Sequence, residues 1–360
     1  MSMSNDSSGL KSALLKNSAL LYSAVRSAQF TAEYLGLQAL TRGVEVLTPP
    51  KTPRQATERD PLLLREVIRE LSRLLERDAQ AIADGVYPPQ VLLPESPVEH
   101  FLRVPRLYSD GVALHLRRLR GRTTEFSPDA SRWLNELPRY FRRNFHFQTD
   151  GYLSERSAEL YEHQVEMLFH GGADAMRRPI IRGLRERFGS QDGEGLRFLE
   201  VGAGTGRATR FVRLAFPKAK IMVTDLSEPY LKTAQKRLSH FDHLDFAQAD
   251  GGALPFSDGH FDAVYSVFLF HELPFAERVK TVSEAARVLK KKGVFAFVDS
   301  IQLGDRREFD ALLGVFPREF HEPFYRDYVA RPMSGLLTEA RFQNIQADYG
   351  FMSKLGWGFK

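Results

Sequence analysis

The sequence contains no cysteine among its 360 residues. A chain without thiols forms no disulfide, has no thiolate nucleophile and builds no zinc site on sulfur. It also lacks the run of about 18 apolar residues that a membrane-spanning helix needs. The N-terminal stretch shows no clear small-residue cleavage site of a signal peptide. These absences fit a reducing compartment, so we expect a cytoplasmic protein without a transmembrane segment.

Neither sign of charge is in large excess, because 50 Lys and Arg stand against 45 Asp and Glu, a formal net charge of +5. Residues 101–150 hold ten Arg and only five acidic residues. These arginines are either solvated side chains on helices or a basic patch for an anionic partner. The length and the 43% of hydrophobic residues are ordinary for a globular chain of about two domains.

The first half of the chain is typical of helices separated by proline-rich segments. We expect frayed residues at 1–9, a helix over 10–46 and a linker over 48–60. Residues 86–105 carry five prolines and are expected to be irregular. The pattern is helical again over 107–190, with breaks expected at Gly111, Gly121, Pro128, Pro138 and Gly151.

One amphipathic helix in this half has clear boundary signals. Asp60 is a favourable N-cap, Pro61 suits the first helical turn, and Gly85 ends the pattern. Apolar residues recur at three- and four-residue spacing, which predicts that one face lies in the core. These positions are Leu64, Val67, Ile68, Leu71, Leu74, Leu75 and Ile82.

From Leu196 onward, short β-type runs alternate with helical runs. The expected strands cover 196–201, 219–225, 244–250, 261–268 and 293–299. The expected helices between them cover 207–215, 228–240 and 276–290. This alternation predicts an α/β fold with a parallel, Rossmann-like sheet, which binds ligands at the carboxyl ends of its strands.

A glycine-rich loop follows the first of these strands, in the sequence Glu200-Val-Gly-Ala-Gly-Thr-Gly-Arg207. The dinucleotide fingerprint G-x-G-x-x-G needs a third glycine where Arg207 stands, and the P-loop needs a Lys-Ser/Thr pair that is absent. The carboxylate of Glu200 would repel a pyrophosphate and favours a ligand that carries an amino group or positive charge.

Acidic residues also end the next two strands. Asp225 comes about twenty residues after the loop, where a carboxylate can accept hydrogen bonds from both hydroxyls of a ribose. Asp250, followed by Gly251, can accept from an exocyclic amine such as that of adenine. The three loops therefore suit an amino acid, a ribose and a base.

Taken together, residues 196–303 resemble the core of a class I S-adenosylmethionine-dependent methyltransferase. The resemblance rests on E-V-G-x-G-x-G, on the acids that end the second and third strands, on the F-D-x-V strand and on the turn from Ala286 to Gly293. It implies a mostly parallel sheet whose last strand, near the C-terminus, is antiparallel. It also implies S-adenosylmethionine as cofactor, held by Glu200, Gly202, Ala203, Gly204, Gly206, Asp225, Leu226, Asp250, Gly251 and Phe268.

The same resemblance predicts the organisation of the chain. The methyltransferase domain is expected at 191–360, preceded by a helical lid or substrate region at 106–190 and by a helical N-terminal region with proline-rich linkers at 1–105. An extension of this size is unusual for the family. It would hold substrate, form a dimer, or contact a carrier protein or the surface of a membrane.

His271, beside Glu272, is the candidate general base, because it follows the fourth strand and would face the methyl-transfer side of the cleft. Alternatively, it only shapes the cofactor pocket. No metal site is expected here, because the zinc motif H-E-x-x-H would need histidine where Phe275 stands.

Aromatic side chains with polar tips gather in two segments that such a fold places near the substrate, before the first strand and before the last two. The candidate substrate residues are Tyr140, His146, Tyr152, His321 and Tyr325. They favour methyl transfer to a small, partly apolar acceptor. The alternatives are an RNA or protein methyltransferase that uses the arginine-rich 101–150 stretch, and a non-catalytic protein that binds the cofactor and acts through its extension. The glycine spacing disfavours a NAD(P)-dependent reductase.

Overall fold

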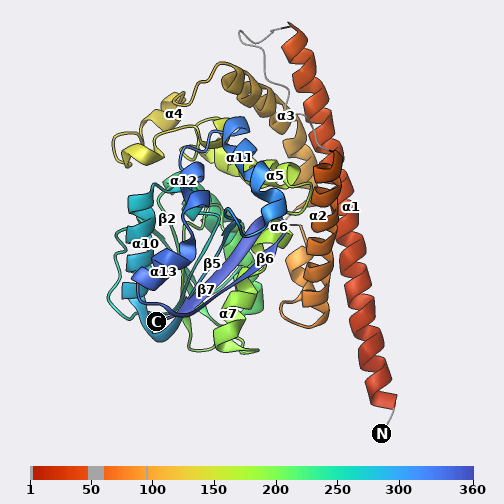
Figure 1. Ribbon diagram of the computed structural model, residues 1–360, viewed down its shortest axis with the longest axis vertical. Coiled ribbons are helices and arrows are strands. Elements are labelled where there is room, and N and C mark those ends of the chain that lie inside the picture. The colour runs from red at the N-terminus through yellow and green to blue at the C-terminus, as the bar shows by residue number, and fades with distance from the viewer. Residues whose placement is uncertain (1–2, 48–60, 95) are drawn as a thin grey trace.

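The computed structural model describes residues 3–47, 61–94 and 96–360. A long N-terminal helix and its neighbours pack along one side of a sheet-containing body, and the N-terminal end of that helix extends past the body (Figure 1). The linker expected over 48–60 and the cap expected at Asp60 lie outside the described residues.

The body is built on one seven-stranded sheet with the order β3-β2-β1-β4-β5-β7-β6. Strands β1 to β5 pair in parallel, whereas β7 pairs antiparallel with both β5 and β6. This confirms the predicted α/β fold and its antiparallel C-terminal hairpin. The strands are β1 (Arg197–Val201), β2 (Lys220–Asp225), β3 (Leu244–Gln248), β4 (Phe261–Val267), β5 (Leu289–Ser300), β6 (Gln343–Gly350) and β7 (Ser353–Phe359).

Helices cover both faces of the sheet. Alternate strand residues point to opposite sides, so each face has apolar side chains for the helices to pack against. On one face, Phe198 of β1 packs with α7 (Ile180–Phe188), α8 (Arg207–Ala215) and α9 (Glu228–Leu238). On the other face, neighbouring Leu199 packs with the buried side chains of the remaining helices of the body. These are α10 (Phe275–Val288), α11 (Asp310–Glu319), α12 (Tyr325–Ala330) and α13 (Met333–Glu339).

The N-terminal part consists mainly of α1 (Met3–Leu47), α2 (Pro61–Ala83), α3 (Pro97–Leu119) and α5 (Glu155–Leu168). Short elements connect them and the strands. These are η1 (Pro89–Leu92), α4 (Pro128–Ser131), η2 (Arg139–Phe141), η3 (Phe145–Phe147), α6 (Ala173–Arg177), η4 (Phe270–Glu272) and η5 (Arg307–Phe309).

Two predictions about helix boundaries in this part are wrong. Helix α1 begins at Met3, so residues 3–9 are helical rather than frayed. Helix α3 begins at Pro97, inside the segment expected to be irregular, because Ser96 caps it by accepting a hydrogen bond from the Glu99 amide and Pro97 fits the first turn. The expected boundary between residues 105 and 106 therefore falls within α3.

Two further predictions about these helices fail. Gly111 does not break α3; its missing side chain leaves room for Leu37 of α1, which a Cβ atom would meet at 2.7 Å. On α2, Leu74 is buried as predicted, but Leu64 and Ile68 are 55% and 57% exposed. The predicted apolar face of α2 is thus open to solvent at Leu64 and Ile68, whereas Val67 between them is partly buried against the core.

Candidate active site

The loop between β1 and α8 contains three glycines in the left-handed region of backbone conformation. Gly202, Gly204 and Gly206 have φ angles of 72°, 57° and 80°, which residues with a Cβ atom rarely adopt. A Cβ on Gly204 would meet nothing within 4 Å, so its backbone borders open space. Gly206 instead faces Leu238 of α9 and sets the entry of the chain into α8.

A cavity of about 110 Å³ lies at the carboxyl ends of β1, β2 and β4, beside this loop. Nine residues predicted to hold the cofactor line it, namely Glu200, Gly202, Ala203, Gly204, Asp225, Leu226, Asp250, Gly251 and Phe268. Gly206, the tenth, does not line it and supports the turn instead. Residues from three separate loops thus meet around one space.

Two buried carboxyl groups give the cavity its electrostatic character. Glu200 accepts hydrogen bonds from Thr209 and, at 2.9 Å, from the Tyr265 hydroxyl, and its Oε1 atom has no hydrogen-bond partner in the described structure. Burial raises the pKa of Glu200 to about 8. Asp225 accepts from the amides of Gly204 and Ser227, each at 2.7 Å, and burial raises its pKa to about 6. A ligand with a positive charge or with hydroxyl groups would stabilise the ionised form of both carboxyl groups.

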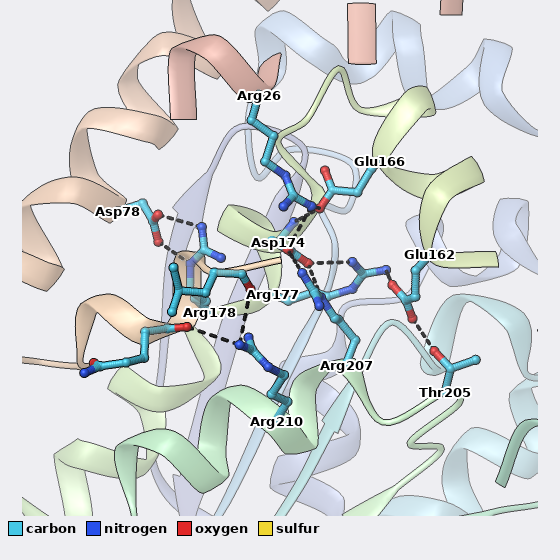
Figure 2. A network of polar contacts seen from close by, with 12 residues as sticks. Arg26, Asp78, Glu162, Glu166, Asp174, Arg177, Arg178, Thr205, Arg207 and Arg210 are labelled. Atoms are coloured by element: carbon cyan, nitrogen blue, oxygen red, sulfur yellow. Dashed lines mark hydrogen bonds and ion pairs between the residues drawn. The ribbon is translucent and has the colours of Figure 1, made fainter. Parts of the chain in front are cut away.

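Polar residues that the sequence analysis missed reach the same cavity from the helical part. Glu162 on α5 accepts from Thr205 of the glycine loop at 2.5 Å and pairs with Arg177 on α6 at 3.0 Å (Figure 2). No short motif joins these residues, because they lie far apart in sequence. Only the spacing of polar residues on the two helices could have pointed to them.

A buried network of charges continues from this point toward α1 (Figure 2). Asp174 on α6 accepts from Arg207 of α8 at 2.9 Å, and from Arg177 and Arg26, each at 3.2 Å. Burial alone would raise the pKa of Asp174, but the neighbouring guanidinium groups hold it well below its usual range. The network connects the first helix to the helix that follows the glycine loop.

A second cavity, of about 270 Å³, adjoins the first. Tyr161, Phe268 and Glu272 line both spaces. Most of the remaining wall of the second cavity is apolar. It includes Leu37 of α1, Leu107 and Leu114 of α3, Val165, Met167 and Leu168 of α5, Phe316 of α11, Phe320 and Met352.

His271 and His146, two of the three histidines that line the second cavity, each lie next to buried carboxyl groups. His271 donates from Nδ1 to Oδ1 of the fully buried Asp299 at 2.6 Å. Burial disfavours the charged imidazolium, but this carboxylate outweighs it and raises the pKa of His271 to about 9. His146 lies 3.1 Å from both Glu272 and Glu322. Their hydrogen bonds likewise outweigh burial and raise the pKa of His146 to about 10.

The structure separates the five candidate substrate residues. His146 and Tyr325 line the second cavity, whereas Tyr140 and Tyr152 line the first. His321 lines neither; its ring lies 5.7 Å from that of Phe147, and burial lowers its pKa to about 4.

Several arginines of the 101–150 stretch form hydrogen bonds or ion pairs with other parts of the molecule. Arg117 is buried and donates to the Phe147 carbonyl, and Arg118 pairs with Glu319 at 3.3 Å. Arg142 donates to the Leu137 carbonyl at 2.6 Å.

None of the described helices combines the length and the apolar character that a membrane span needs.

Comparison with known proteins supports the interpretation of this site. A family model described as "Methyltransferase domain" matches residues 198–293. The chain is 28% identical to a malonyl-[acyl-carrier protein] O-methyltransferase of Geobacter sulfurreducens over 51% of the chain and 71% of that protein. It is 32% identical to a fatty-acid O-methyltransferase of Mycolicibacterium smegmatis over 40% and 52%, respectively. A demethylmenaquinone methyltransferase of Thermotoga maritima is 26% identical over 55% of the chain and 86% of its own length.

The family match runs from β1 to the first residues of β5 and includes the glycine loop and the acids beside it. The strand order and the cavity agree with it. S-adenosylmethionine is therefore the cofactor of this chain, and the dinucleotide alternative is set aside. Residues 198–293 thus carry a methyltransferase domain, and the chain, with its helical extension before the sheet, is a methyltransferase similar to the class I S-adenosylmethionine-dependent enzymes.

Proposed function

We propose that this methyltransferase acts on a small acceptor with an apolar body, which lies in the second cavity. One observation carries the proposal: a largely apolar cavity of about 270 Å³ shares Tyr161, Phe268 and Glu272 with the cavity beside the glycine loop. An acceptor in the second cavity would thus have its reactive end next to the cofactor. Residues 191–360 would supply most of the cofactor site, with Glu162 reaching it from α5, and the preceding helices would enclose the acceptor.

The residues of the first cavity fit S-adenosylmethionine. The carboxyl groups of Glu200 and Glu162 suit its amino group, and the open backbone at Gly204 lets the ligand approach closely. Asp225 suits the ribose hydroxyls, and Asp250 suits the amine of adenine. When bound, the cofactor supplies an electrophilic methyl group on its sulfonium sulfur.

Two roles are open to His271, and they depend on the acceptor. With Nδ1 bound to Asp299, the neutral ring presents its Nε2 lone pair and would take the proton from a hydroxyl or phenol. With a pKa of about 9, the ring is mostly protonated at neutral pH and would instead donate to a carboxylate acceptor, which has no proton to lose. The pH dependence of the rate separates these two cases.

The relatives favour an acceptor with an apolar chain or ring system. Two of them carry names that specify O-methylation of a malonyl group on a carrier protein and of a fatty acid, and the third acts on demethylmenaquinone. A carrier-bound acceptor would need contact with a protein partner. We also propose a cytoplasmic location, which rests on the absence of cysteine.

Calorimetric titration with S-adenosylmethionine, S-adenosylhomocysteine and NADH tests the cofactor first. We expect micromolar binding of the two sulfur compounds and no response to NADH. Methyl transfer is then measured with fatty acids of increasing chain length, lipophilic phenols and quinols, and with an RNA and a basic peptide as polar comparisons. Transfer only to the apolar acceptors supports the proposal. Transfer to the RNA or the peptide would overturn it, and cofactor binding without transfer to any acceptor would favour a non-catalytic binding protein.

A further inference from the structure

Three side chains with metal-ligating atoms meet outside both cavities of the methyltransferase site. Glu33 comes from α1, His100 from α3 and His163 from α5. Their ligand atoms all lie within 4.8 Å of one another. His100 and His163 also line a third cavity of about 250 Å³, which neither the cofactor nor the proposed acceptor uses.

The two imidazole rings face the same carboxylate. The Nε2 atom of His100 lies 2.8 Å from Oε1 of Glu33, and the Nε2 atom of His163 lies 2.6 Å from Oε2. The rings are stacked with their centroids 4.2 Å apart. Two nitrogen atoms and two oxygen atoms therefore surround one small volume between three helices.

A fourth polar side chain reaches the same point. The amide group of Gln29 lies 2.6 Å from Nε2 of His100 and 3.0 Å from Oε1 of Glu33. Rotation of this amide by half a turn would place its oxygen there instead. A cation in their midst would be attracted to the lone pairs of the carboxylate, of both imidazole rings and of the rotated amide.

The His163 side chain is buried, and its Nδ1 atom has no hydrogen-bond partner in the described structure. In the tautomer that carries its proton on Nδ1, the Nε2 atom that faces Glu33 offers the lone pair that a metal ion would bind.

We propose that Glu33, His100 and His163 form a zinc site. Two imidazole nitrogens and one carboxylate are a common ligand set for Zn²⁺, whereas Mg²⁺ and Ca²⁺ prefer oxygen ligands. Access from the third cavity allows water or the Gln29 amide to complete the coordination. The sequence gives no signal for this site, because its ligands come from three helices and follow no short motif.

The effect of the ion would be structural. Helices α1, α3 and α5 also supply Leu37, Leu107 and Val165 to the wall of the second cavity. A cation bound by all three helices would fix their spacing without contacting the cofactor. The site is independent of the proposed acceptor, because its ligands line neither cavity of the active site.

The test uses the full-length protein after treatment with a chelator. Titration with ZnCl₂ should show one ion bound per chain, and Co²⁺ in its place should give the visible absorption bands of a nitrogen- and oxygen-ligated ion. The variants His163→Gln and His100→Gln should each lose at least tenfold in affinity for Zn²⁺. His240→Gln is the matched control, because His240 is exposed, in the turn that follows α9, and belongs to none of the three cavities; it should bind as the wild type does.

The measurement separates a metal site from a hydrogen-bonded cluster. Saturating Zn²⁺ should raise the midpoint of thermal unfolding of the wild type and of the control, but not that of the two variants. Absence of Zn²⁺ binding in the micromolar range, or equal binding by all four proteins, overturns the proposal. His100 is partly exposed, so His100→Gln serves as the decisive variant if His163→Gln does not fold.

Discussion

His271 and Asp299 form a residue pair whose charge state bears on the chemistry that we propose for the second cavity. Asp299 also accepts from the amide of Phe270 at 2.7 Å, so the loop after β4 is fixed by the same carboxylate that orients the imidazole. Because the pKa of His271 is raised on folding to about 9, its protonation stabilises the folded state fully below about pH 6.5 and ceases to do so above pH 9.

The first prediction concerns the pH dependence of methyl transfer to a phenol or hydroxyl acceptor. The rate should rise with pH and level off above about 9, where His271 is neutral. Asp299→Asn removes the charge that raises this pKa, so the midpoint should move down toward about 6.5. The measurement is kcat from about pH 6 to 10 for both proteins. An identical midpoint in the two would show that His271 is not the group that titrates.

The second prediction concerns Asp225. Asp225→Ala should weaken binding of S-adenosylmethionine by about 1–3 kcal/mol, because hydrogen bonds from the ribose hydroxyls to a carboxylate are lost. Calorimetric titration checks this value. Asp245→Ala, on the exposed side of the neighbouring strand β3, is the control and should bind normally. Equal affinity in both variants would count against the assignment of the ribose to Asp225.

At the scale of elements, a buried ion pair fixes α2 to the segment that leads into α7. Arg178 donates twice to Asp78, each time at 2.7 Å, and Asp78 also accepts from the Tyr87 hydroxyl. The neighbouring residue, Arg77, pairs with Asp348 at the surface, where nearly half of its side chain is exposed. Consecutive residues of one helix thus form one buried pair and one solvated pair.

This contrast gives the third prediction. Asp78→Ala leaves a buried guanidinium without its partner and should lower the free energy of unfolding by about 3–5 kcal/mol. Arg77→Ala breaks a screened pair and should cost about 1 kcal/mol or less. Denaturation in urea, monitored by circular dichroism, measures both. Similar losses for the two variants would mean that burial does not distinguish the pairs.

The elements that carry the cofactor loop are also those that the sequence predicts best. Helix α8 covers the predicted residues 207–215, since glycines and an apolar strand define its start. The first part of α3, up to Pro105, was not predicted, because prolines favour irregular chain, whereas Pro97 starts the helix and Pro105 is accommodated within it. The second cavity could not be predicted, because its walls come from elements with no shared local sequence pattern.

At the scale of the whole molecule, the extension and the sheet domain together line the second cavity, in which we propose that the acceptor lies. Thr41 on α1 lines this cavity, and Ala39, two residues earlier, is exposed to solvent. The fourth prediction compares them. Thr41→Phe should lower kcat/KM for long apolar acceptors by about tenfold, the rate equivalent of about 1.4 kcal/mol, because the larger side chain occupies their space.

Ala39→Phe is the matched control and should leave kcat/KM close to that of the wild type. Both variants should bind S-adenosylmethionine normally, because neither residue lines the first cavity. Steady-state kinetics over a series of acceptor chain lengths is the measurement. If Thr41→Phe has the same effect on short and long acceptors, or none, the second cavity does not hold the apolar body of the substrate.

The first helix and the last hairpin both contribute to the walls of the second cavity. Tyr34 of α1 and Met352, in the turn between β6 and β7, line the same space. During synthesis, the first helix leaves the ribosome long before that turn, so the cavity that both of them line stays incomplete until the last hairpin emerges. The residues that line the first cavity all lie between Tyr140 and Thr281, and a nascent chain would thus acquire its cofactor site before it has any enclosed place for an acceptor.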